Sequence, residues 1–216
     1  MTRTRVWAVL LACVLSAFAA REAAAGPATD QLRGAIDRVV KVLEDPALKS
    51  QDRAADRRAV VRKIADDIFD FTEIARRSLA RHWQPLTDKQ RAEFISLFSD
   101  LLERSYISKI DLYGGEKIVY VGERIDGDLA SVATRIITKN GTDVPIDYRL
   151  LKKGDRWLVY DVHIEGVSLV SNYRTQFNKI IQTASYNELV QKLKLKQEEL
   201  TSDEEPKRKR VTPVKK

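Results

Sequence analysis

The stretch RWLVYDVHIEGVSLVSNYRTQF, residues 156–177, changes from the periodicity of a strand to that of a helix. In its first part alternate residues are apolar, which predicts a strand with one apolar face. That face consists of Leu158, Tyr160, Val162 and Ile164. After Gly166 the apolar residues recur every three or four positions, which predicts a helix. Its apolar stripe consists of Leu169, Tyr173, Phe177 and Ile180. A strand and a helix this close in sequence must bury their apolar sides near each other, and the other segments are expected to cover them.

Helices are predicted before this stretch, from apolar residues at helical spacing and from capping signals. They are expected from Thr29 or Asp30 to Asp45-Pro46, after Ser50, from about Thr72 to His82-Trp83, and from Thr87 to Gly114-Gly115. The last is the longest, because it opens with the capping box TDKQ and ends at a glycine pair, a common helix stop.

Strands dominate the second half. They are expected at 116–125, 129–139, 143–152 and 156–165. The pairs Asp126-Gly127, Asn140-Gly141 and Lys153-Gly154 favour tight turns, so consecutive strands should be antiparallel. After the helix that follows Gly166, a last helix is capped by the sequence SYNE at 185–188. The predicted fold class is therefore α+β: a four-stranded antiparallel meander sheet packed against N-terminal and C-terminal helices.

The formal net charge of +7 over 216 residues is concentrated at the two ends of the chain. Residues 26–200 contain 29 Lys and Arg against 27 Asp and Glu, whereas the tail from Thr201 has six basic and three acidic residues. A nucleic-acid-binding domain would carry its excess charge on the folded part. The near-neutral central segment argues against nucleic acid as a partner.

The N-terminus has the layout of a Sec export signal. Arg3 and Arg5 precede an apolar run that ends at Ala20, and an Ala triplet offers a cleavage site before Gly26. This run is too short and too rich in alanine for a comfortable membrane span. We therefore predict a signal peptide at 1–25, an α+β domain at 26–200 and a disordered basic tail at 201–216, which is charged and nearly free of large apolar residues.

Cys13 is the only cysteine in the chain. The sequence LLAC at 10–13 resembles a lipobox, so a lipoprotein is an alternative, but the following residues stay apolar where a lipid-anchored protein would begin a polar tether. With cleavage before Gly26 the mature chain would contain no cysteine. That would exclude disulfides, thiolate catalysis and zinc held by cysteine.

Few residues suggest catalysis. His163 lies between Asp161 and Glu165 on one strand face, a pattern that could bind a metal or position a general base, but a solvated polar face gives the same pattern more often. His82, at a helix end, is interpreted as a packing or capping residue, and Asp70 as surface charge. The chain contains no G-x-S-x-G, P-loop, G-x-G-x-x-G or H-E-x-x-H motif. We do not expect an enzyme, a cofactor or a metal site.

Aromatic residues are spread over both the predicted sheet and the predicted helices. Two interpretations are open, because the same residues would form an ordinary hydrophobic core or the wall of a cavity for an apolar ligand. Periodicity does not separate them.

Three segments carry a resemblance to a known family. They are FDFTEIARRSLARHW at 69–83, LTDKQRAEFISLFSDLLERSY at 86–106 and WLVYDVHIEGVSLVSNYRTQF at 157–177. In this order they resemble the periplasmic phospholipid-binding MlaC family of the Mla lipid-transport system, also called toluene-tolerance proteins, over nearly all of residues 28–200. Ala80 departs from the resemblance where glycine is expected, with an effect on helix packing, and the basic tail has no counterpart.

The resemblance implies a soluble periplasmic carrier that buries phospholipid acyl chains in an apolar cavity between sheet and helices. Its implied partners are an inner-membrane ABC transporter with its substrate-binding subunit and an outer-membrane lipoprotein complex, and the carrier is expected to be a monomer. A related branch accompanies hopanoid synthesis, so the cargo could instead be a hopanoid or a different lipid. Two hypotheses of other classes stay open: an isomerase or hydratase on a cone-shaped α+β scaffold with Asp161 or His163 as base, and a lipid-free adaptor with a filled core.

Positions in the predicted elements select the residues that would contact the acyl chains. They are Phe94, Phe98, Leu101, Leu102, Tyr106, Val132, Ile146, Tyr148, Tyr160, Val162, Val167, Leu169 and Tyr173. Arg149, Asn172 and Arg174 are candidates for the head group or the rim of the cavity. The first set could equally be plain core, and the second set could equally be solvated surface.

Overall fold

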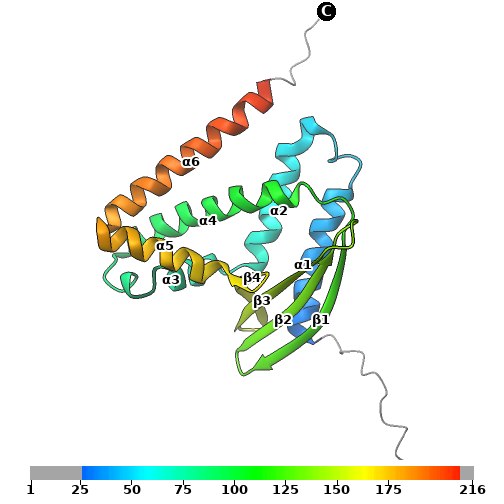
Figure 1. Ribbon diagram of the computed structural model, residues 1–216, viewed down its shortest axis with the longest axis horizontal. Coiled ribbons are helices and arrows are strands. Elements are labelled where there is room, and N and C mark those ends of the chain that lie inside the picture. The colour runs from blue at the N-terminus through cyan, green and yellow to red at the C-terminus, as the bar shows by residue number, and fades with distance from the viewer. Residues whose placement is uncertain (1–25, 210–216) are drawn as a thin grey trace, which may run out of the picture.

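The computed structural model describes residues 26–209, with helices packed on a meander sheet (Figure 1). The α-helices are α1 (Pro27–Glu44), α2 (Ala54–Ile68), α3 (Phe71–Leu79), α4 (Asp88–Ile110), α5 (Leu169–Thr183) and α6 (Tyr186–Lys209). The strands are β1 (Lys117–Asp126), β2 (Leu129–Ile137), β3 (Asp143–Lys153), β4 (Arg156–Ile164) and β5 (Val167–Ser168). Short 3₁₀ turns, Gln51–Arg53 and Ala80–His82, precede α2 and follow α3.

The sheet has the order β1-β2-β3-β4-β5, and each neighbouring pair is antiparallel. The α+β class, the meander and the order of helices and strands are as predicted. The fifth strand is the difference, because four strands were expected. β5 has two residues and pairs only with the end of β4, too short a run to leave an alternating pattern in the sequence.

A β-bulge in β4 corrects the predicted apolar face. The pairing with β3 steps from Val159 to Asp161, so Tyr160 is the extra residue. Trp157 and Val159 therefore share a face with Val162, and all three are buried. The prediction that Tyr160 belongs to this face is wrong, because strict alternation holds only where no residue is inserted.

The inner face of the sheet packs against α1 and α2. We call this group the sheet cluster: Ala28, Leu32, Ala35, Ile64, Ile68, Ala130, Val132, Leu150, Trp157, Val159 and Val162, with Ile36, Val39, Val42, Phe69, Tyr120, Ile146, Tyr148, Ile164 and Leu169 half-buried around them. The start of α1 is fixed to β1, because the amide of Thr29 donates to the Glu123 carboxylate.

The later helices form a second apolar group beside β4 (Figure 1). We call it the helical cluster: Ile74, Ala75, Leu79, Trp83, Leu86, Phe94, Leu97, Phe98, Val170, Phe177, Leu189, Val190 and Leu193, with Phe69, Phe71, Ile95, Leu101, Leu102, Tyr173, Ile180, Ile181 and Tyr186 half-buried around them. Residues 26–209 thus form two apolar cores rather than one, and Phe69 packs against both.

Backbone pairing joins the two cores at the start of α3. Phe69 forms an isolated parallel bridge with Val159, and the Asp70 amide donates to the Val159 carbonyl at 2.9 Å. Asp70 is also the N-cap of α3, since its Oδ1 accepts the Glu73 amide at 3.0 Å. Asp70 is only 6% exposed, so its interpretation as surface charge is wrong.

Helix α6 continues to Lys209, so helical backbone extends into the segment expected to be disordered from Thr201. Glu, Lys and Arg are abundant there and propagate a helix that has already begun. The predicted signal peptide at 1–25 and the end of the tail at 210–216 lie outside the described residues. Within 26–209, no helix has the length and apolar composition that crossing a membrane requires.

Candidate functional site

The apolar candidates divide between the two cores. Phe94, Phe98, Leu101, Leu102 and Tyr173 belong to the helical cluster. Val132, Ile146, Tyr148, Val162 and Leu169 belong to the sheet cluster. The candidates outside both clusters are Tyr106, Tyr160 and Val167. A ligand that touched both sets would therefore lie where the two cores meet.

Aromatic packing fills the centre of the helical cluster. Phe94 and Phe98 are 0% and 1% exposed, and their ring centroids lie 5.6 Å apart. Phe98 meets Tyr173 and Phe177 edge to face, both at 5.0 Å. In this structure the two Phe residues of α4 have the role of core residues.

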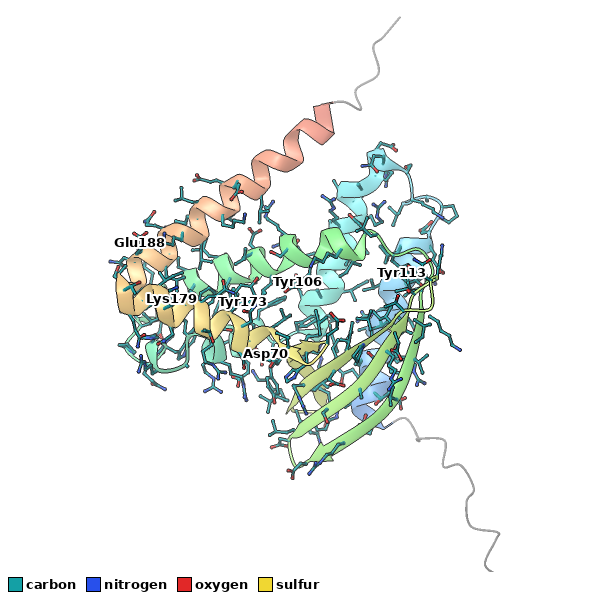
Figure 2. All side chains as sticks on the ribbon, viewed as in Figure 1. Asp70, Tyr106, Tyr113, Tyr173, Lys179 and Glu188 are labelled. Atoms are coloured by element: carbon teal, nitrogen blue, oxygen red, sulfur yellow. The ribbon has the colours of Figure 1, made fainter. Side chains whose placement is uncertain are left out.

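The half-buried candidates on α4 and α5 lie at the margins of the two cores. We call Leu101, Leu102, Tyr106, Leu169 and Tyr173 the apolar seam. Leu101, Leu102 and Tyr173 border the helical cluster, whereas Leu169 borders the sheet cluster. Figure 2 shows Tyr106 and Tyr173 on the neighbouring helices α4 and α5.

The two tyrosines of the seam influence each other. Burial raises the pKa of Tyr173, and the nearby phenol of Tyr106 adds to the shift. Burial also raises the pKa of Tyr106. Both groups therefore stay protonated and neutral at physiological pH, which suits their apolar surroundings.

Ion pairs fix the end of α4 to α2. Arg57 Nε lies 3.0 Å from one Asp111 carboxylate oxygen, and Arg58 Nε lies 2.7 Å from the other. One turn further along α2, Arg62 pairs with Glu103. Burial raises the pKa of Glu103, and Arg62 opposes that shift. The half of α4 that carries the apolar seam is thus held by charged contacts to α2 rather than by apolar packing alone.

Two of the remaining apolar candidates have other surroundings. Val167, in β5, is 61% exposed and belongs to neither core. Tyr160, the bulge residue of β4, lies under the Arg77 guanidinium, whose carbon is 4.0 Å from the ring centroid. A ligand contact at Tyr160 would have to share the ring with this arginine.

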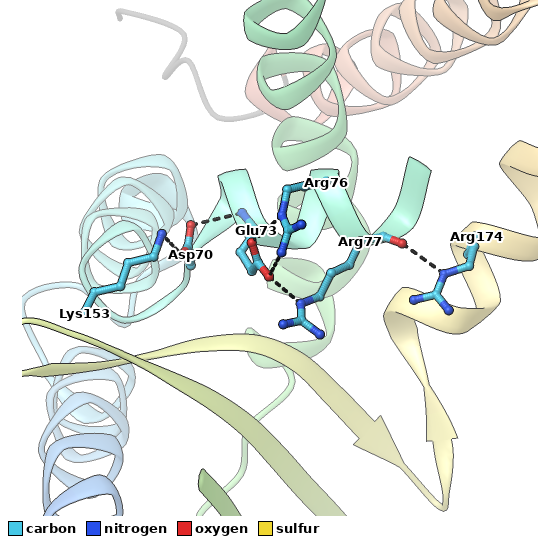
Figure 3. Close-up of polar contacts among 6 residues, drawn as sticks. All are labelled: Asp70, Glu73, Arg76, Arg77, Lys153 and Arg174. Atoms are coloured by element: carbon cyan, nitrogen blue, oxygen red, sulfur yellow. Dashed lines mark hydrogen bonds and ion pairs between the residues drawn. The ribbon is translucent and has the colours of Figure 1, made fainter. Parts of the chain in front are cut away.

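The rim candidates are spread over the surface. Arg149 lies on the outer face of the sheet, because its neighbours Tyr148 and Leu150 face the sheet cluster. Arg174 Nε donates to the Arg77 carbonyl at 2.9 Å and so joins α5 to α3 (Figure 3). Asn172 is exposed, and its Oδ1 accepts Gln176 Nε2 at 3.2 Å within α5.

A carboxylate on α3 neutralises two arginines (Figure 3). Glu73 is 6% exposed and accepts hydrogen bonds from Arg76 and Arg77, with Arg76 Nε at 2.7 Å. The hydrogen bond from Arg76 is the main reason that the pKa of Glu73 is below its usual value, although burial opposes it. Beside it, Lys153 pairs with Asp70. Because Glu73 sits in an Arg-rich segment, no pattern in the sequence indicated that it is buried.

The polar residues at the end of β4 have a structural role. Asp161 is 9% exposed, so its expected place on a solvated face is wrong. Its Oδ1 accepts the amides of Val162 and Val170 at 2.9 and 3.0 Å, and its Oδ2 accepts the Ser168 hydroxyl at 2.6 Å. His163 Nε2 lies 3.2 Å from the same Oδ2. The carboxylate is occupied in capping α5, which leaves it poorly placed to act as a base.

His82 Nε2 lies 3.0 Å from Asn178 Oδ1 on α5, so this histidine is a packing contact between the 3₁₀ turn after α3 and α5. Over residues 26–209, no group of three or more His, Cys, Asp or Glu side chains is placed to hold a metal ion.

The hollows on the surface of the described residues include the following two. The larger, about 640 Å³, lies at the end of α1 and is lined by Asp37, Val40, Lys41, Glu44, Asp45 and Pro46. The smaller, about 280 Å³, is on the outer face of the sheet and includes Arg149. The apolar candidates line neither, so the lipid cavity remains a prediction, and the apolar seam holds half-buried candidates at the margins of both cores.

Comparison with known proteins gives concordant results. A family model described as MlaC protein matches residues 33–195. The intermembrane phospholipid transport system binding protein MlaC of Haemophilus influenzae is 22% identical over 200 residues, which cover 89% of this chain and 94% of that protein. The solved structure of a phospholipid-binding protein from Ralstonia solanacearum, in complex with a phospholipid, superposes with a TM-score of 0.71 and 26% identity, covering 81% of this chain and 98% of that one.

Proposed function

The chain belongs to the MlaC family, and we propose that it is a periplasmic carrier that buries the acyl chains of a phospholipid at the apolar seam. The observation that carries the proposal is the likeness to a protein solved with a phospholipid bound. This likeness covers 81% of this chain and 98% of that protein. The relative from Haemophilus influenzae, named as a binding protein of an intermembrane phospholipid transport system, supports the same role.

Physical chemistry explains why such a carrier is needed. A diacyl lipid has on the order of 30 methylenes, and each costs about 0.8 kcal/mol to expose to water. Passage across an aqueous compartment is therefore slow unless a protein covers both chains. A carrier with two apolar cores can do so by letting the cores separate, so that the chains lie between them.

Residues of the apolar seam and of the adjoining sheet cluster would contact the lipid. Leu101, Leu102, Tyr106 and Tyr173 would contact it from the helices, and Leu169, Val162 and Tyr148 from the sheet side. Phe94 and Phe98 would support these residues from behind, because they already pack against other aromatic rings. The ion pairs of Asp111 and Glu103 would keep the end of α4 in place while the chains enter.

Export through the predicted signal peptide would place the carrier between two membranes. There we expect it to exchange lipid with an inner-membrane ABC transporter through that transporter's substrate-binding subunit, and with an outer-membrane lipoprotein complex. A partner must open the seam for release, since a well-buried lipid would otherwise leave slowly.

Native mass spectrometry tests this proposal. The protein, purified without detergent, should show a mass increment that solvent extraction identifies as phospholipid. A hopanoid in the extract would keep the carrier and change its cargo. A protein that is free of lipid, and stays so after incubation with phospholipid vesicles, would reject the carrier and favour the lipid-free adaptor.

A further inference from the structure

Arg33 on α1 lies over the ring of Tyr120 on β1. The guanidinium carbon is 4.4 Å from the ring centroid, and the arginine is half-buried. No carboxylate of the described residues forms an ion pair with it, although Asp37 is one helical turn away. A half-buried guanidinium without a counter-ion is costly, and it offers its N–H groups to an anion.

The hydroxyl groups of Tyr120 and Tyr148 lack an acceptor for their protons. The Tyr120 hydroxyl oxygen is buried, and none of residues 26–209 accepts a hydrogen bond from it, although the donor Arg33 lies beside it. Tyr148 forms no side-chain hydrogen bond with them either. The two tyrosines share the inner face of the sheet, because they pair with Thr134 and Val132, which are two residues apart on β2.

The Arg33 guanidinium and the hydroxyl groups of Tyr120 and Tyr148 are all hydrogen-bond donors. Burial raises the pKa of Tyr120 to about 12, and Asp37 adds to the shift, whereas Arg33 opposes it by its charge and as a hydrogen-bond donor to the phenol oxygen. Burial likewise raises the pKa of Tyr148 to about 12, and the neighbouring Tyr120 contributes. Both phenols therefore keep their protons, and the group of Arg33, Tyr120 and Tyr148, here called the donor cluster, lacks an acceptor.

The donor cluster borders residues proposed to contact acyl chains. Tyr120 and Tyr148 pack against the sheet cluster, which contains Val132 and Val162. An acceptor bound by the donor cluster would thus have the apolar surface of the sheet cluster on one side, where the rest of an apolar ligand could lie. On the other side, Asp37 lines the hollow at the end of α1, so the position is close to solvent.

We propose that the donor cluster binds the phosphodiester group of the lipid, with Arg33 supplying the positive charge and the two tyrosines hydrogen bonds. A phosphodiester offers two charged oxygens, which match the fork of a guanidinium. This inference rests on the proposed function, and it adds selection of phosphate-bearing lipids over neutral ones.

A competition between two lipids tests the inference. The protein is incubated with vesicles that contain equal amounts of phosphatidylglycerol and of diacylglycerol with the same acyl chains, and the lipid on the recovered protein is quantified. Wild type should be enriched in phosphatidylglycerol. Arg33→Gln should lower that enrichment about tenfold or more, since a hydrogen bond to a charged group is lost. Tyr120→Phe should lower it less.

Arg38→Gln is the matched control, because Arg38 lies on the same helix but is exposed and pairs with Asp67 at 3.1 Å. It should keep the wild-type ratio. A ratio in Arg33→Gln and Tyr120→Phe equal to that of wild type would overturn the inference and leave the carrier intact. Wild type that takes up neither lipid would instead reject the proposed function.

Inorganic phosphate separates two sources of the anion. Uptake of phosphatidylglycerol that phosphate inhibits, relative to chloride at equal ionic strength, while diacylglycerol uptake stays constant, supports a site for the lipid head group, because the two anions then compete for it. Phosphate that binds the protein without changing phosphatidylglycerol uptake would overturn the head-group assignment in favour of a site for free phosphate. Unfolding curves of each variant establish that a changed ratio does not reflect a damaged fold.

Discussion

The amide of Val170, in the first turn of α5, donates a hydrogen bond to the Asp161 carboxylate of β4 at 3.0 Å. This contact lies at the point where the chain passes from the sheet to the helices. The same carboxylate accepts the Ser168 hydroxyl at 2.6 Å, and Ser168 in turn caps α5 by accepting the Ser171 amide. One buried carboxylate therefore fixes the angle between β4 and α5, and with it the position of the apolar seam.

Asp161→Ala should destabilise the protein. The change removes the acceptor of two buried amides, so we expect the free energy of unfolding to fall by about 2–3 kcal/mol. Urea unfolding followed by circular dichroism measures this. Asp155→Ala, at an exposed turn position on the other end of β4, is the control and should change it by about 0.5 kcal/mol or less. Equal effects of both changes would show that Asp161 has no special role.

Ala80→Gly should stabilise the protein. Ala80 has φ of 49°, a backbone conformation that favours glycine, so its departure from the family acts on backbone strain rather than on helix packing. Relief of this strain, less the added entropy of the unfolded chain, should raise the free energy of unfolding by about 1 kcal/mol. The matched control is Ala92→Gly, on an exposed position inside α4, which should lower the free energy of unfolding by about 1 kcal/mol. A loss of stability in Ala80→Gly would contradict the strain argument.

Glu73→Gln should destabilise the protein at neutral pH and not in acid. Hydrogen bonds from the two arginines lower the pKa of Glu73 in the folded state below its unfolded value. Its stabilisation is therefore present above the unfolded pKa, near 4.5, and is lost as the pH falls through the lower folded pKa. Urea unfolding at a series of pH values should show the difference between wild type and variant narrowing below about pH 4.5. A difference that is constant with pH would assign the effect to packing.

Substitutions in the apolar seam should separate lipid binding from folding. Leu102→Gln and Leu169→Gln place a polar group at half-buried positions, and we expect a clear fall in bound lipid with a loss of about 1–2 kcal/mol of stability. Phe98→Ala should instead cost about 3–5 kcal/mol, because this ring is 1% exposed and packed among aromatic neighbours.

The exposed Val167 provides the control for these seam variants. Val167→Gln should change neither lipid content nor stability, since its side chain belongs to neither core. Lipid content is measured as phosphorus per mole of protein, and stability by urea unfolding. Full lipid binding by Leu102→Gln and Leu169→Gln would move the site away from the seam.

The helices, the meander, the fold class and the family could all be predicted from the sequence. Apolar spacing and glycine-containing turns act over a few residues, so the sequence predicts a strand at 143–152, which the structure extends by one residue at its end. The family predicted from three sequence motifs is confirmed by the model that matches residues 33–195.

Which side chains are buried where elements meet became clear only from the folded chain. The bulge at Tyr160 depends on how β4 pairs with β3, and it puts Leu158 on the face opposite to Val162, although the sequence predicts one shared face. Asp161 and Asp70 looked like solvated charge because their partners lie on other elements. Nothing in its Arg-rich segment indicated that Glu73 is buried. Periodicity reports the environment of a single strand or helix, whereas the burial of a charge depends on partners distant in sequence, and these are brought together only when the chain folds.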